Sequence, residues 1–408
     1  MIHLQPLQQT KVPASEIFDR IRRFQGHLQE FGIELALLRQ NSDLYYFTGT
    51  VQDGHLLIPA RGEPLFLVWR AFERAVEEAA LNKEYIEPLL GLSSLKDILQ
   101  RKGLEDPETV GLELDCLPAN LYLYYSGKVW PRAKFLDATH AVRITRAIKS
   151  FWEIERIRDA CIQTASVTAL VPGILCPDIE ELEFAAHIEA SMRRLGHPGY
   201  IRMRGWNQEC GIGQILSGAE GALPSWTNTP GGGSGTSSAY GQGAGLRTIK
   251  PYEPVSVDLG GSLNGYLSDQ TRLFCIKGLP DRLMDAYKAI LEVHYGIAER
   301  LVPGAVCSSI YDWALSSTDA LGYGQNFMGF GRNKVIFVGH GLGLEIDEYP
   351  FISKGNNMIL SQGMVVAVEP KLIFPSDGLI GIEDTYLITE KGAERLTTSP
   401  QGLVTVPA

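Results

Sequence analysis

The sequence predicts two domains, an α/β domain over residues 1–145 and an α+β domain over residues 146–408. The first observation is length, because 408 residues exceed one ordinary domain and suit two. The second is that short apolar runs alternate with helical patterns through the first third of the chain. The third is that the remainder consists of long helical patterns separated by glycine-rich stretches with strand patterns.

The first domain begins with a helical pattern. Apolar residues recur at helical spacing over residues 15–31, and Ser15 is available as the N-cap. Apolar runs at residues 35–38 and 65–69 predict strands, and residues 71–81 predict another helix. This alternation is typical of a sheet covered by helices.

The second domain begins after a boundary at residues 141–150 and contains four predicted helices. They span residues 151–171, 178–195, 281–302 and 308–321. Asp178 is the expected N-cap of the second helix, with Glu181 at its N3 position. The glycine-rich stretch at residues 230–245 is either a flexible linker or an ordered loop at a site.

The composition excludes several classes of function. The net charge is −10 and Lys and Arg do not form a run, which argues against a nucleic-acid partner. No apolar run approaches the roughly 20 residues that span a bilayer, which argues against a membrane partner. The six cysteines are scattered and the N-terminus lacks a signal-peptide pattern, so we expect a cytoplasmic protein with reduced thiols.

Two aspartates are predicted to share one face of a hairpin in residues 255–274. A turn at Asn264-Gly265 places Asp269 opposite Gly260, on the face that carries Asp258. A turn one residue earlier places Asp269 directly opposite Asp258. Either register points both carboxylates the same way, and such acids repel each other unless a cation or a proton lies between them.

Two glutamates repeat this arrangement. Glu369 ends one apolar strand pattern and Glu383 lies in a second. A loop centred on Ser376 sets the two glutamates opposite each other. His340 lies between glycines, which allow other backbone to approach its ring. Any one of these residues could be a surface acid or a core histidine. Together, four carboxylates and one imidazole predict a pair of Mn, Fe, Co or Zn ions, which would activate a shared water and polarise a carbonyl.

The chain resembles the pita-bread metallopeptidases of peptidase family M24, which include prolidase, aminopeptidase P and creatinase. The motifs are two aspartates eleven residues apart (258 and 269), Thr271-Arg272, Gly-His340-Gly-Leu-Gly, Glu369-Pro370 and Ile-Glu383-Asp-Thr. Residues 41–49 are similar to the creatinase-type N-terminal domain. The resemblance implies a creatinase-like α/β N-terminal domain and an α+β pita-bread catalytic domain with pseudo-two-fold symmetry.

The same resemblance implies a role for each ligand. Asp258 would chelate one ion, Asp269 and Glu383 would bridge both, and His340 and Glu369 would bind the other. Glu369 would also carry the proton from the attacking water to the leaving amine. Two Mn²⁺ ions are expected, with Co²⁺, Zn²⁺ and Fe²⁺ as alternatives, and a homodimer is expected.

Several positions depart from the family pattern. Asp347 stands where a second histidine assists the reaction, and it is either a catalytic residue that receives a cationic substrate group or a polar loop residue. The region before Asp258 lacks another family histidine, and Gly381 replaces an arginine. Tyr266 matches a family tyrosine and is either a substrate contact or a packed strand aromatic.

The sequence therefore predicts a metal-dependent hydrolase that cleaves short peptides, with Xaa-Pro bonds as the expected target. The lost histidines keep a second hypothesis open, a creatinase-like amidinohydrolase or lyase acting on a small metabolite. A third hypothesis is a binding module without activity, since the fold alone does not determine function.

Overall fold

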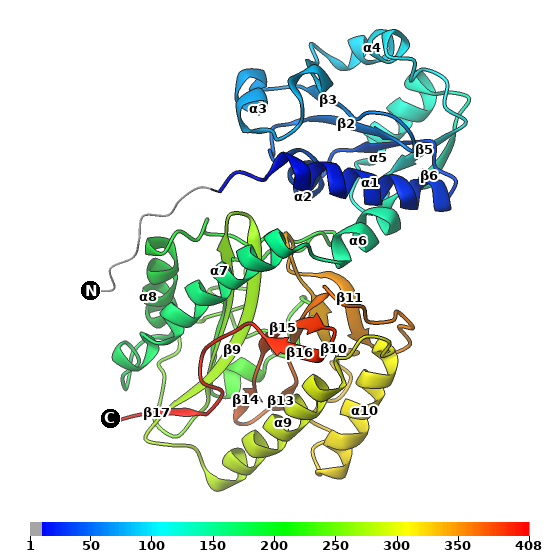
Figure 1. The fold of residues 1–408 in the computed structure, drawn as a ribbon. Coiled ribbons are helices and arrows are strands. Elements are labelled where there is room, and N and C mark those ends of the chain that lie inside the picture. Colours follow the sequence, from blue (N-terminus) through cyan, green and yellow to red (C-terminus); the bar gives the residue numbers. More distant parts are fainter. Residues whose placement is uncertain (1–9, 408) are drawn as a thin grey trace. The chain divides into compact units, whose positions relative to one another are not determined.

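The computed structural model describes residues 10–407. The N-terminal stretch without a signal-peptide pattern, residues 1–6, lies outside them. The described chain divides into two compact units, drawn in Figure 1. One comprises the residues up to Arg146 together with Arg204–Asn207, and the other comprises Ala147–Met203 and the residues from Gln208 onward. Within residues 10–407, no helix has the length and apolar character required to cross a membrane.

The N-terminal unit is a mixed six-stranded sheet flanked by helices (Figure 1). Its strands are β1 Leu35–Leu38, β2 Gly54–Pro59, β3 Leu65–Val68, β4 Ile86–Pro88, β5 Thr109–Leu112 and β6 Lys134–Asp137, in the order β4-β3-β2-β1-β5-β6. Its helices are α1 Ala14–Glu30, α2 Asn41–Thr48, α3 Phe72–Glu78, α4 Leu95–Arg101, α5 Ala119–Tyr124 and α6 Thr139–Ala147. The α/β fold predicted for this half is confirmed.

Helix α1 buries the apolar stripe that its sequence predicts. Ile17, Phe24 and Leu28 have no exposed surface, and they recur at the spacing of one helix face. The predicted N-cap is wrong, however, because the helix already begins at Ala14 and Pro13 occupies the N-cap position. Proline is compatible with this N-cap, because its ring fixes φ at about −65° and the observed φ is −63°.

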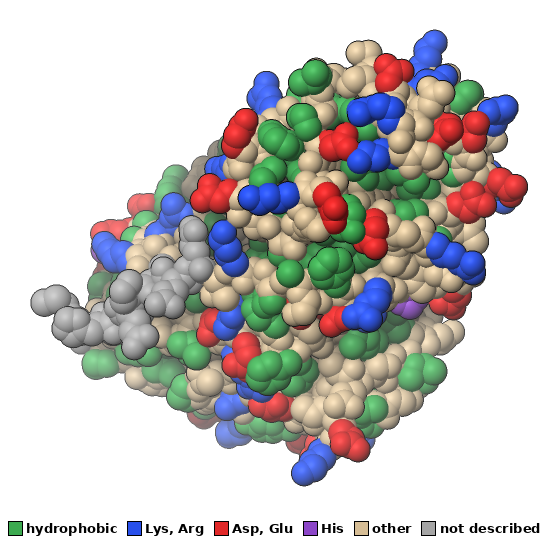
Figure 2. All heavy atoms as spheres, turned by 45° about the horizontal axis from the view of Figure 1, so that its top comes forward, with side chains coloured by type: hydrophobic (Ala, Val, Ile, Leu, Met, Phe, Trp, Pro, Cys, Tyr) green, Lys and Arg blue, Asp and Glu red, His purple; other side chains and the backbone are tan. Residues whose placement is uncertain are grey.

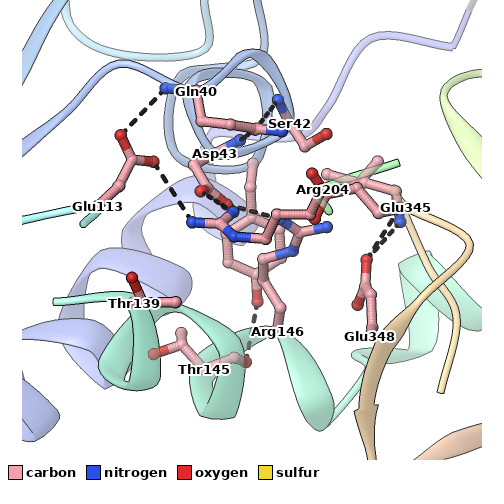
Figure 3. A network of polar contacts seen from close by, with 12 residues as sticks. Gln40, Ser42, Asp43, Glu113, Thr139, Thr145, Arg146, Arg204, Glu345 and Glu348 are labelled. Atoms are coloured by element: carbon pink, nitrogen blue, oxygen red, sulfur yellow. Dashed lines mark hydrogen bonds and ion pairs between the residues drawn. The ribbon is translucent and has the colours of Figure 1, made fainter. Parts of the chain in front are cut away.

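A buried ionic network joins α2 to other parts of the N-terminal unit. Arg146 Nη1 and Arg204 Nη1 each donate to one carboxylate oxygen of Asp43 at 2.6 Å, and Figure 3 shows both guanidinium groups beside this carboxylate. Arg204 also donates through Nε to Asp115 at 2.5 Å. The Arg204 side chain is 3% exposed, so its charge is buried and balanced by these carboxylates. Burial acts to raise the pKa of Asp43, but the two guanidinium groups outweigh it and hold that pKa well below its usual range.

The C-terminal unit contains two larger sheets and a two-stranded one. The first has β7 Gly213–Ser217, β8 Val255–Leu263, β9 Tyr266–Ile276 and β17 Val404–Val406, in the order β17-β9-β8-β7. The second has β10 Phe337–Gly341, β11 Glu348–Ser353, β12 Val365–Val368, β15 Asp384–Thr389 and β16 Gly392–Arg395, in the order β11-β10-β12-β15-β16. Strands β13 Lys371–Phe374 and β14 Gly378–Gly381 form the small sheet.

Each larger sheet is covered by a pair of helices (Figure 1). The helices are α7 Phe151–Thr168, α8 Glu181–Arg194, α9 Asp281–Arg300 and α10 Cys307–Ala320. Helices α7 and α8 pack on the β7–β9 sheet, and α9 and α10 share a buried core with the β10–β12–β15 sheet. This repeated pairing agrees with the α+β fold and the two similar halves that the resemblance implies.

The start of α8 differs from its predicted form. Asp178 has a positive φ of 63° and does not cap the helix, which begins at Glu181. The first helical N–H groups are instead satisfied by distant backbone, because Glu181 N–H donates to Arg247 O and Leu182 N–H donates to Gly245 O. Long-range pairing therefore replaces the local cap.

The glycine-rich stretch at residues 230–245 is an ordered loop rather than a linker. Its residues 230–233 are buried, and Gly243 N–H donates to Gly232 O at 2.7 Å. The Glu181 side chain accepts the Gly245 N–H at 2.7 Å and the Ser217 N–H at 2.6 Å. Helix α8 thereby anchors the end of the loop to β7.

The surface is mixed in charge over the face in Figure 2. Lys and Arg side chains there are interspersed with Asp and Glu, and apolar side chains lie between them. The described residues on this face form no continuous basic area, in keeping with a chain whose net charge is −10.

Candidate metal centre

The two acid-bearing hairpins have the registers that their turns favour. Asn264 and Gly265 both have positive φ, and Gly260 pairs with Asp269, so the first of the two predicted registers is confirmed. In the second hairpin Phe374 pairs with Gly378, which centres the loop on Ser376 as predicted. Strands β12 and β15 continue the same register, so the two glutamates lie opposite each other at the junction of the two ladders.

Threonine side chains tie the hairpins together at their acids. Thr385 Oγ1 accepts the Asp269 N–H at 3.0 Å and donates to Asp269 O at 2.9 Å. Thr271 Oγ1 donates to Glu383 Oε2 at 2.8 Å. Each hairpin thus positions an acid of the other, which explains how residues more than a hundred positions apart share one site.

One nitrogen of His340 faces three buried carboxylate oxygens. Its Nε2 lies 3.4 Å from Glu369 Oε1, 3.8 Å from Asp269 Oδ2 and 3.9 Å from Glu383 Oε1. Two ligands on a tetrahedral ion with bonds near 2.1 Å lie about 3.4 Å apart, so a small contraction would bring these atoms onto one ion. Among the described residues nothing donates a hydrogen bond to the buried Glu383 Oε1. This nitrogen and these oxygens therefore fit one divalent cation.

The other nitrogen of His340 is oriented away from Asp269, Glu369 and Glu383. Its Nδ1 lies 3.2 Å from Gly341 O and 3.7 Å from Asp347 Oδ1. Metal-binding histidines commonly donate this second N–H to a carbonyl or carboxylate, which fixes the ring and directs the lone pair to the ion. Asp347 is therefore placed beside the imidazole, with about a third of its side chain exposed.

The surroundings shift the pKa values of the three converging acids in different directions. Burial and the neighbouring Glu383 and Asp258 raise the pKa of Asp269 well above its usual value. Burial, opposed by the Lys371 ammonium, raises the pKa of Glu383 to about 8. Burial would also raise the pKa of Glu369, but Lys371 and His340 outweigh it and lower that pKa to about 2. Glu369 is thus the acid most strongly held as a carboxylate.

Lys371 is the residue of this site that the sequence analysis did not predict. Its Nζ donates to Glu369 Oε2 at 2.8 Å, to Asp258 Oδ2 at 2.9 Å and to Glu383 Oε2 at 3.3 Å. Burial would lower the pKa of Lys371, but these three carboxylates raise it well above its usual value. The available signal was a lysine that opens an otherwise apolar strand, Lys-Leu-Ile-Phe, directly after Glu369-Pro370.

The predicted site residues thus separate into three groups. Asp269, His340, Glu369 and Glu383 converge, Asp258 lies on the Lys371 side, and Asp347 lies behind the imidazole.

Tyr266 is fully buried, its hydroxyl donates to Glu153 Oε1 at 3.0 Å, and its ring meets Trp152 edge to face. Its substrate role stays a prediction, and its observed contacts are those of a packed strand aromatic.

This fold and this buried cluster of acids around one histidine define a metal-dependent hydrolase. Residues 155–390 match the model of metallopeptidase family M24, and residues 20–148 match that of the creatinase/prolidase N-terminal domain. The chain belongs to metallopeptidase family M24. The family implies divalent metal ions as cofactors.

Similar proteins match 95–96% of this chain. The Xaa-Pro dipeptidase of Pyrococcus furiosus is 28% identical over 389 residues, which are 95% of this chain and 99% of that protein. The structure of the Xaa-Pro dipeptidase from Bacillus anthracis has 25% identity and a TM-score of 0.81, over 96% of this chain and 100% of that one. The prolidase from Pyrococcus horikoshii has 25% identity and a TM-score of 0.78, over 95% and 100%.

Proposed function

We propose that this chain hydrolyses short peptides at Xaa-Pro bonds, with a divalent cation held by Asp269, His340, Glu369 and Glu383. The observation that carries the proposal is the convergence of His340 Nε2 with three buried carboxylate oxygens at 3.4–3.9 Å. The substrate follows from full-length similarity to proteins named Xaa-Pro dipeptidase. A Mn²⁺ ion, a homodimer and a cytoplasmic location are further parts of this proposal.

Glu369 is assigned the proton transfer. A bound divalent cation would supply charge that lowers the pKa of water and polarises the scissile carbonyl. Glu369 lies beside this position, with Oε1 3.4 Å from His340 Nε2, and from there it would accept a proton from the attacking water and return it to the departing amine. The carboxylates of Asp269 and Glu383 hold the cation together with His340.

Asp347 is assigned a positioning role in place of the catalytic one expected from its sequence position. Its carboxylate lies on the Nδ1 side of His340, opposite the nitrogen that faces the acids. Gly341 O, 3.2 Å from Nδ1, accepts the ring N–H, and the Asp347 carboxylate at 3.7 Å adds a negative charge that favours this orientation and strengthens the other nitrogen as a ligand. Asp347 thus acts on the reaction through His340.

The test is hydrolysis of Xaa-Pro dipeptides and tripeptides by the full chain loaded with Mn²⁺, Co²⁺ or Zn²⁺. We expect proline release that a chelator abolishes and that Glu369→Gln lowers about 10²–10⁴-fold, the usual share of a general base. Glu390→Gln, at an exposed position, is the matched control and should retain wild-type rates. No proline release with any metal at full loading would overturn the substrate assignment, and hydrolysis of a small non-peptide amide would then favour the creatinase-like alternative.

A further inference from the structure

Lys371 lies where a cation is needed and fills that place completely. Its ammonium has three N–H donors, and three carboxylates lie within 2.8–3.3 Å of the nitrogen. The side chain is 3% exposed. Every donor of the ammonium is therefore committed to an acid of the site, and none is left for a substrate.

The two glutamates connect the ammonium to the His340 side of the site. Glu369 presents Oε1 to His340 Nε2 and Oε2 to Lys371 Nζ. Glu383 does the same, with Oε1 on the histidine side and Oε2 on the lysine side. In the two-metal centre that the resemblance implies, Glu383 would link the two ions and Glu369 would bind one of them. Here they link the histidine side to a lysine.

A second ion would need the oxygens that Lys371 already holds. Divalent ions bind carboxylate oxygen at roughly 2.0–2.2 Å, so an ion on Asp258 Oδ2 and Glu383 Oε2 would stand at the place of Nζ. The ammonium would also repel that ion at very short range. Asp258 and Lys371 thus form an ion pair that competes with the second metal position.

The backbone provides room for this lysine. Gly381 is the cross-strand partner of Lys371, and a Cβ atom at position 381 would lie 2.5 Å from Lys371 Cγ. The lysine stem therefore passes over a position that must lack a side chain. The glycine is also the position at which the family resemblance leads one to expect an arginine, so the fixed positive charge comes here from the opposite strand.

We propose that Lys371 replaces one of the two divalent cations, so that this chain binds a single ion on Asp269, His340, Glu369 and Glu383. Asp258 is then the partner of Lys371 rather than a metal ligand. The inference rests on the proposed function in that it requires a divalent-ion site, but it does not depend on the peptide that is cleaved.

The experiment is a Co²⁺ titration of the metal-depleted full chain, followed by visible absorption and by elemental analysis after desalting. We expect saturation at one ion per chain for the wild type and for Lys371→Arg, which retains the charge. Lys371→Ala should bind a second ion and reach two. Lys149→Ala is the matched control, because it removes another buried lysine, one paired with Glu348 at 3.2 Å, and should stay at one.

The ligand assignment has its own readout in the same titration. Asp258→Asn should change the affinity for the first ion by less than about threefold, whereas His340→Ala should lower it at least about 100-fold, beyond the 10–100-fold range of outer partners.

Two ions in the wild type, or one in a folded Lys371→Ala variant, would overturn the proposal. The wild-type count decides even if that variant does not fold. One ion in the wild type with two in Lys371→Ala supports the proposal whether or not Xaa-Pro peptides are cleaved, and a wild type that binds no ion overturns both the proposal and the metal site.

Discussion

Gly381 and Lys371 are complementary partners across β13 and β14: the glycine lacks the atom that the lysine stem would strike. A Cβ atom at position 381 would lie 2.5 Å from Lys371 Cγ and 3.1 Å from its Cβ. These distances lie below ordinary van der Waals contact of about 3.5–4.0 Å. The position of the buried ammonium thus depends on an absent side chain on the neighbouring strand.

Gly381→Ala should therefore destabilise the protein by about 1–3 kcal/mol, the usual cost of overpacking a buried site. The strain arises because Lys371 cannot move aside without leaving the three carboxylates of Asp258, Glu369 and Glu383. Urea unfolding followed by circular dichroism measures this difference. Gly402→Ala is the control, since a Cβ there would meet no atom within 4 Å.

A double-mutant cycle tests whether contact with the Lys371 side chain causes this destabilisation. In a Lys371→Gly background the same Gly381→Ala change should cost at least about 1 kcal/mol less, because residues in contact couple by 0.5–3 kcal/mol. Equal costs in the two backgrounds would show that the lysine stem is not what the new methyl group meets.

The acid-bearing hairpins could be predicted from the sequence because local signals determine them. Asn264-Gly265 selects a two-residue turn with positive φ at both positions, and the period of two then places Asp258 and Asp269 on one face. The same reasoning set Glu369 against Glu383. Turn chemistry and strand alternation act over a few residues, so they can be read without the fold.

Lys371 could not be predicted in the same way because its partners are distant. Asp258 lies 113 positions away in the chain, and the space for its stem depends on a glycine of the opposite strand. Asp178 failed as a helix cap for a related reason, since backbone near residue 247 satisfies that helix start. Local pattern predicted the elements and the acids, whereas the balancing charge required the tertiary contacts.

Asp347→Ala tests the assignment of Asp347 as a positioning partner of His340, the proposed metal ligand. Removal of a carboxylate beside a ligating imidazole typically weakens metal binding 10–100-fold, so Co²⁺ affinity should fall within that range. Asp312→Ala, at an exposed position of α10, should leave the affinity unchanged. Unchanged affinity in Asp347→Ala together with a raised KM would instead assign Asp347 to the substrate.

Asp43→Ala should destabilise the N-terminal unit by about 3–5 kcal/mol, the cost of breaking a buried ion pair on one side. The substitution leaves Arg146 and Arg204, both 3% exposed in their side chains, without the carboxylate that accepts from each at 2.6 Å. Hydrogen exchange of the α2 amides and urea unfolding measure the loss.

The control in the same unit is the exposed pair of Arg132 and Asp106, whose side chains are 80% and 64% exposed. Asp106→Ala should cost no more than about 1 kcal/mol, because solvent screens such pairs. Similar losses in Asp43→Ala and Asp106→Ala would contradict a structural role for the buried network.

His294 should make the protein less stable in mild acid. Burial lowers the pKa of His294 to about 4, and Asp384 at 3.6 Å opposes this shift only in part, with Arg272 acting against it. Since the unfolded imidazole titrates near its ordinary value of about 6.5, the unfolded state binds more protons between pH 6.5 and 4. Stability is therefore lost as pH falls through this window, by about 3 kcal/mol at 1.36 kcal/mol for each pKa unit.

His294→Gln removes this titration. The difference in the free energy of unfolding between the wild type and the variant should therefore shrink by about 3 kcal/mol from pH 7 to pH 4. Urea unfolding of both proteins across that range measures the difference. His187→Gln, at an exposed position of α8, controls for loss of a histidine at the surface. Stability curves of the wild type and His294→Gln that run parallel from pH 7 to pH 4 would mean that the buried imidazole is not excluded from protonation, because a group with the same pKa in both states adds no pH dependence to folding.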